Sequence, residues 1–224
     1  MAYERRLNDA IADEMLDRLA RSDELSQIRH RVQITSFGGS GTTALHEHLL
    51  QAGVDVPTTP GSFPFKHQRV PPASNAVPPG FRVVYPFGDP RNAVVSVFRR
   101  GFQGGHYRGM RLRKPTLEAE DHLTDLEHFL EGGIDEFEMQ DHFDRWFTRG
   151  DRTYPVLFLS FQHLAQAWPT LCEFVGLAAD TAPLSLRTRA SEWNTLEAPQ
   201  RERIDAMYGA LARRLAALPP VEIR

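Results

Sequence analysis

Glycine and hydroxyl side chains are concentrated directly after the apolar residues near position 32, at spacings that could serve chemistry. A strand entering a glycine-rich turn and continuing as a helix directs backbone N–H groups and the positive end of the helix dipole at one point. The sequence therefore predicts a phosphate-binding loop, and an ordinary glycine turn is the alternative. The residues concerned are Gly38, Gly39, Ser40, Gly41, Thr42 and Thr43.

A basic stretch at residues 101–114 is the second segment of interest. Its charged and imidazole side chains lie among four glycines and show no helical periodicity, which predicts a loose loop. Such a loop either closes over an anion or remains a solvated surface loop. The basic side chains are His106, Arg108, Arg111, Arg113 and Lys114.

Composition limits the classes of function. The 224 residues, 41% hydrophobic and 25% charged, predict a single domain over residues 1–224. A net charge of −3 argues against a globally basic nucleic-acid-binding protein but permits a local basic pocket. The one cysteine, Cys172, has no internal disulfide partner and is expected in a packed helix face. No apolar run is long enough to cross a bilayer, so we expect a cytoplasmic protein without membrane contact.

Strands and helices alternate along the predicted chain. Apolar runs predict strands after Arg31, at 81–87 and at 154–160. Amphipathic spacing, caps and stop signals predict helices at 4–20, 42–52, from Asp89 onward, 116–130, 135–149, 168–175 and 199–218.

This alternation predicts an α/β fold with a three-layer arrangement, in which helices cover both faces of a parallel sheet. Residues 1–30 are expected to form an amphipathic helix and linker before a nucleotide-binding core at 31–224. The carboxyl ends of the strands would bring together the glycine loop, the turn at 88–91 and Ser160.

Four segments, in order, resemble the sulfotransferases that use 3′-phosphoadenosine 5′-phosphosulfate (PAPS). Residues 37–43 resemble that family's 5′-phosphosulfate loop, and 83–96 its strand, turn and helix for the 3′-phosphate. Residues 155–177 resemble a later strand, turn and helix, with 142–146 upstream in the customary place. Residues 187–194 resemble the basic loop before the final helix. The resemblance implies a P-loop-containing sulfotransferase fold.

The resemblance also implies roles for individual residues. His67 corresponds to the general base and Lys66 to a lysine beside it, while the glycine loop would hold the phosphosulfate. An imidazole suits proton transfer because its pKa lies near neutrality. The side chains implied at the 3′-phosphate are Arg91 and Ser96, with Arg99, Arg187 and Arg189 as further cations.

Two departures from the family pattern remove positive charge. Gly39 occupies the place of the loop lysine, and Gly88 that of the arginine opening the 3′-phosphate motif. A charge-assisted hydrogen bond contributes about 1.5–3 kcal/mol, so such losses require compensation. Lys66 is a candidate to replace the cation missing at Gly39.

The predicted function is transfer of a sulfonate group from PAPS to a hydroxyl or amine of a small-molecule or glycan acceptor. A non-catalytic sulfotransferase-like binding protein is the main alternative. A nucleotide-dependent kinase or NTPase is less favoured because Thr42 stands where such loops carry lysine. His46 and His48 face different ways on a helix, so no metal site is expected. A homodimer is left open.

Overall fold

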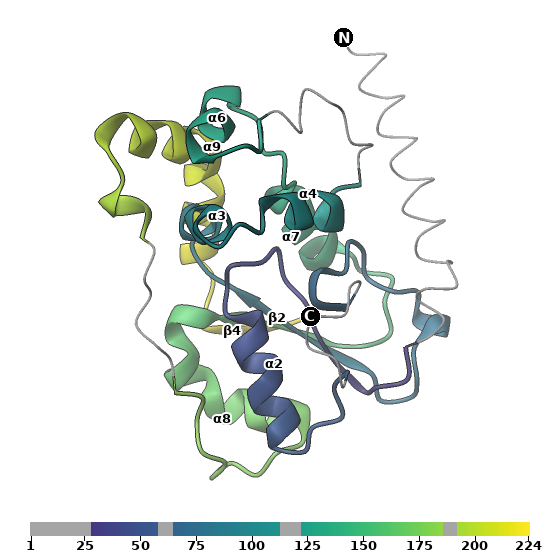
Figure 1. Ribbon diagram of the computed structural model, residues 1–224. Coiled ribbons are helices and arrows are strands. Elements are labelled where there is room, and N and C mark those ends of the chain that lie inside the picture. Colours follow the sequence, from purple (N-terminus) through teal and green to yellow (C-terminus); the bar gives the residue numbers. More distant parts are fainter. Residues whose placement is uncertain (1–27, 58–64, 113–121, 186–191) are drawn as a thin grey trace.

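The computed structural model describes residues 28–57, 65–112, 122–185 and 192–224, which form an α/β fold around a four-stranded sheet (Figure 1). The strands lie in the order β1 (Val32–Ile34), β2 (Arg82–Phe87), β3 (Val156–Ser160) and β4 (Val221–Ile223). The first three strands are parallel and β4 runs antiparallel to β3. The predicted parallel sheet is therefore confirmed for three strands, and β4 is an addition that the sequence did not predict.

Helices cover both faces of this sheet. The longer ones are α2 (Thr42–Gln51), α3 (Pro90–Arg99), α4 (Gln103–Met110), α6 (Leu126–Gly132), α7 (Met139–Thr148), α8 (Leu164–Val175) and α9 (Ala198–Ala216). Short 3₁₀ turns are η1 (Phe65–His67), η2 (Ser74–Ala76), η3 (Phe161–His163) and η4 (Trp193–Thr195). None of the helices in these ranges is long and apolar enough to span a membrane.

Alternation along β2 separates two apolar cores. Tyr85 and Phe87 pack in one core with residues of α3, α6, α7 and α9, whereas Val84 packs in the other with residues of α2 and α8. Successive side chains of a strand point to opposite faces of the sheet, which explains the division. Figure 1 shows α2 and α8 on one side of the sheet and α3, α4 and α7 on the other. The expected three layers are present.

Helix α4 corrects the prediction of a loose loop at 101–114. Its glycines weaken helix propensity, but Tyr107 and Met110 are 1% and 0% exposed in the core. Burial of these two side chains outweighs the glycine cost. The last residues of the predicted loop, including Arg113 and Lys114, lie outside the described residues.

Helix ends follow the local chemistry that the sequence indicates. Asp89 caps α3 by accepting a hydrogen bond from Arg91 N at 2.9 Å, and Pro90 occupies the first turn. In the described part of the helix predicted at 116–130, α6 begins at Leu126 with Asp125 as its cap, and residues 116–121 lie outside the described residues. The helix predicted at 4–20 lies outside the described residues.

Candidate functional site

The glycine loop joins β1 to α2 with three left-handed backbone conformations. Gly38, Gly39 and Gly41 have φ values of 90°, 66° and 75°. Gly41 precedes the first residue of α2, which has no side-chain cap. The first turn of this helix therefore presents its backbone donors beside the loop, as an anion site requires.

The hydroxyl groups inside the loop form hydrogen bonds to other protein groups. Ser40 Oγ lies 3.0 Å from both Ser36 Oγ and the Pro86 carbonyl oxygen, and Ser36 Oγ lies 2.7 Å from Thr42 Oγ1. Ser40 and Thr42 are 1% and 3% exposed. These two hydroxyls hold the shape of the loop, and Thr43 is the hydroxyl-bearing residue at its outer side.

Close packing explains why glycine stands where the resembled family has lysine. A Cβ atom at Gly39 would lie 2.5 Å from both Cα and Cβ of Ala93 on α3. A Cβ atom at Gly41 would lie 2.0 Å from Cζ of Phe161. Positive φ and the neighbouring atoms together leave no place for a lysine at position 39.

Lys66 brings a cation to the same loop from η1. Its Nζ donates a hydrogen bond to Thr43 Oγ1, in the first turn of α2. Burial, followed by repulsion from Arg100, lowers the pKa of this ammonium, and Glu47 acts weakly in the opposite direction. A cation beside the positive end of a helix dipole is an unfavourable arrangement without an anion between them.

His67 lies next to Lys66 with a defined tautomer. Its Nδ1 is 2.9 Å from the carbonyl oxygen of Ser36, and a carbonyl oxygen only accepts hydrogen bonds, so Nδ1 carries the proton. Nε2 is then the basic nitrogen. Burial holds the pKa of His67 well below its usual range, with His106 as the second cause, so the ring is neutral at pH 7.

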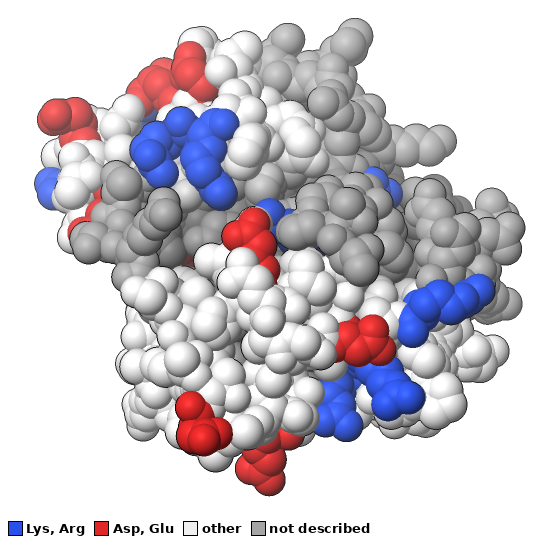
Figure 2. Space-filling model, turned by 60° about the horizontal axis from the view of Figure 1, so that its bottom comes forward, with Lys and Arg blue, Asp and Glu red and all other residues white. Residues whose placement is uncertain are grey.

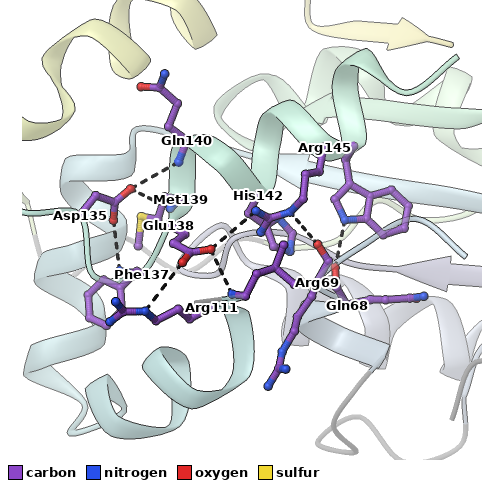
Figure 3. A network of polar contacts seen from close by, with 12 residues as sticks. Gln68, Arg69, Arg111, Asp135, Phe137, Glu138, Met139, Gln140, His142 and Arg145 are labelled. Atoms are coloured by element: carbon purple, nitrogen blue, oxygen red, sulfur yellow. Dashed lines mark hydrogen bonds and ion pairs between the residues drawn. The ribbon is translucent and has the colours of Figure 1, made fainter. Parts of the chain in front are cut away.

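Helix α7 holds the backbone of Gln68 and Arg69 (Figure 3), directly after Lys66 and His67. Trp146 Nε1 donates to the Gln68 carbonyl oxygen at 3.0 Å, and Arg145 Nε donates to the Arg69 carbonyl oxygen at 3.0 Å. The residues that resemble the family at 142–146 thus contact the main chain directly after His67. They position the candidate base through main-chain atoms.

A buried ionic network supports these α7 contacts. Glu138, 4% exposed, lies 3.6 Å from Arg145 Nη1 and 3.7 Å from Arg111 Nε, and accepts from Leu112 N at 3.0 Å. Figure 3 shows Glu138 between the two guanidinium groups. This carboxylate joins the end of α4 to the start of α7.

At the start of α3, Arg91 already has partners. Its guanidinium bonds to Asp89 at 2.7–3.2 Å and to Asp205 at 2.5 Å, and lies 3.9 Å above the ring of Trp193. Two carboxylates thus compensate its charge, and a 3′-phosphate would have to displace one of them. Ser96 lies farther along α3, where its carbonyl oxygen accepts from Arg100 Nε at 3.0 Å.

A second positive charge near the loop comes from Arg100, which the sequence did not single out for this role. Arg100 lowers the pKa of Lys66, His67 and His106, so its positive charge lies near all three. Its position four residues after Ser96 on one helix face is the signal that could have indicated it. Arg187 and Arg189, the other predicted cations, lie outside the described residues.

Charge elsewhere on the surface is mixed. Arg99 lines a pocket of about 470 Å³ together with Gln103 and Asp125. On the face shown in Figure 2, basic and acidic side chains are interspersed over a mainly uncharged surface.

Comparison with known protein-family models, curated proteins and solved structures found no match to this chain.

Proposed function

We propose that the protein binds PAPS at the glycine loop and transfers its sulfonate group to a hydroxyl or amine of a small-molecule or glycan acceptor. The observation that carries the proposal is the contact between Lys66 and Thr43 at the start of α2. The Lys66 ammonium lies there at the positive end of the α2 dipole, and no carboxylate among the described residues bonds to Lys66. Without an anion, the ammonium and the positive end of the helix dipole repel each other, whereas a bound phosphosulfate would be attracted by both.

The residues have distinct roles in the proposed reaction. Lys66 and the loop amides hold the phosphosulfate and compensate charge that develops on the bridging oxygen. The sulfur–oxygen bond to the phosphate breaks as a bond from sulfur to the acceptor oxygen or nitrogen forms. His67 Nε2 takes the proton of the acceptor, and adenosine 3′,5′-bisphosphate leaves.

A non-catalytic binding protein of similar shape is the second candidate. The observation that favours it is the pairing of Arg91 with Asp89 and Asp205, which occupies the guanidinium predicted for the 3′-phosphate. Gly88 supplies no charge at this end either. If the protein binds adenosine 3′,5′-bisphosphate but releases none from PAPS with phenols, alcohols and amines as acceptors, this second function holds.

Calorimetry with adenosine 3′,5′-bisphosphate tests the proposed site. Loss of one charge-assisted hydrogen bond weakens binding roughly 10- to 150-fold, so Lys66→Met should raise Kd by this factor. Arg203→Met, which removes a cation paired with Glu127 between α9 and α6, is the matched control and should leave Kd unchanged. Equal affinity of wild type and Lys66→Met, or no binding at millimolar ligand, would refute the proposal.

The rarity of lysine allows a direct second measurement. The chain has only two lysines, Lys66 and Lys114, so [13C]lysine labelling gives two side-chain signals that Lys66→Met assigns. Adenosine 3′,5′-bisphosphate should shift the Lys66 signal and raise the pKa of its ammonium, because a bound anion favours the charged form. An unchanged Lys66 signal at saturating ligand would place the ligand elsewhere.

A further inference from the structure

Helix α4 brings a second imidazole against the candidate base. His106 is 7% exposed, and its ring centroid lies 4.7 Å from that of His67, with the two planes inclined at 50°. The ring of Phe137 also packs against His106, with 6.2 Å between the ring centroids. His106 therefore lies between the core and His67.

Both imidazoles meet the glycine loop at Gly38. A Cβ atom at this position would lie 2.2 Å from His106 Nε2 and 3.3 Å from His67 Cε1. With φ at 90°, Gly38 allows the chain to pass beneath the two rings without a side chain. The ring of His67 is thus held by Ser36 at Nδ1, by Gly38 below and by His106 beside it.

An imidazole at position 106 is not explained by packing alone. Its Nε2 is buried and has no hydrogen-bond partner among the described residues, while the ring bonds to the backbone of Phe102 through its other nitrogen. A phenyl ring of similar shape would fill the same space without an unsatisfied polar atom. An imidazole differs from a phenyl ring here in that it also disfavours protonation of His67.

The titratable groups near His67 among the described residues are all basic. Lys66 precedes it on η1, Arg100 follows α3, His106 comes from α4 and His142 from α7. Burial is the main cause that lowers the pKa of His106 to about 4, and Arg100 is the next. At neutral pH the His67 and His106 rings are uncharged, and His106 disfavours protonation of His67.

We infer that His106 is a positioning residue for His67: its ring holds the His67 imidazole beside Gly38 in the tautomer whose Nε2 accepts a proton. The inference rests on the proposed function only for the reaction in which that proton is taken. His106 acts through His67, since Gly38 covers its own Nε2.

Nitrogen-15 NMR of histidine-labelled full-length protein tests this role without substrate. His67→Gln assigns the His67 signals, and wild type, His106→Phe and His106→Ala are compared. In wild type we expect the Nδ1–H tautomer of His67. In His106→Phe an aromatic ring still packs beside His67, so the Nδ1–H tautomer should remain while the pKa of His67 rises. In His106→Ala no ring packs beside His67, and the His67 signals should show a mixture of the two tautomers.

The matched control is His128→Phe on α6, where the exposed ring pairs with Asp125, and it should change neither His67 signal. If the tautomer and the titration of His67 are the same in wild type, His106→Phe and His106→Ala, the inference is overturned. If His106→Ala does not fold, His106→Val, which also removes the ring, takes its place and should show the same mixture of tautomers. Calorimetry with adenosine 3′,5′-bisphosphate separately decides the proposed function.

Discussion

A substitution at Gly39 tests most directly how closely the glycine loop packs against α3. Gly39→Ala introduces a Cβ atom 2.5 Å from Cα and Cβ of Ala93, at a φ of 66°. The left-handed conformation costs an L residue about 1–2 kcal/mol, and overpacking against a backbone atom costs about 1–3 kcal/mol more. We expect the free energy of unfolding to fall by about 2–5 kcal/mol.

Gly53→Ala isolates the conformational part of this cost. Gly53 follows α2 with φ 83°, and a Cβ atom there would have no neighbour within 4 Å. Urea unfolding of both variants should therefore place Gly39→Ala about 1–3 kcal/mol below Gly53→Ala. Equal destabilisation would mean that the loop does not press on α3 and that position 39 has room for a lysine. Our explanation of the missing lysine would then be wrong.

Two further predictions concern buried carboxylates. Glu138→Gln leaves the buried guanidinium of Arg145 without its anion, whereas Arg111 keeps its ion pair with Glu136, and it should cost about 3–5 kcal/mol of unfolding free energy. Asp151→Asn in an exposed pair should cost about 0–1 kcal/mol. A small cost at Glu138, measured by the same urea titration, would contradict the described network. Burial raises the pKa of Asp135 to about 6 against the hydrogen bond from Tyr208, so its protonated form is favoured in the folded state. Its contribution to stability is full below about pH 4 and declines as pH rises through 6. Asp135→Asn should therefore gain stability relative to wild type between pH 4.5 and 7.5, and an unchanged difference would contradict the raised pKa.

Local patterns in the sequence predicted most of the layered fold. The apolar runs predicted β2 and β3, and the Asp89 cap with Pro90 predicted the start of α3. The glycines of α4 argued against a helix, because the apolar contacts that stabilise it come from other parts of the chain. Strand β4 has only three residues and is fixed by pairing with β3, which local periodicity does not reveal.

The sequence indicated several residues of the candidate site but not which of them contact one another. Lys66 was a candidate cation from its segment, but its contact with Thr43 joins residues 23 positions apart in the sequence. The pairing of Arg91 with Asp205 spans 114 positions and has no signal in the sequence around either residue. His106 was visible only as one of several basic residues, since its place beside His67 follows from the unexpected helix α4.

The way α7 holds the segment after His67 has a consequence for how this site can change. Trp146 and Arg145 contact carbonyl oxygens of Gln68 and Arg69, atoms that every residue type possesses. These two contacts hold the segment after His67 whatever side chains stand at positions 66 and 67. Evolution or an engineer can exchange the reactive groups there by single substitutions while the chain keeps its course. The proposed reactive groups are thus separate from the contacts through which α7 holds this segment.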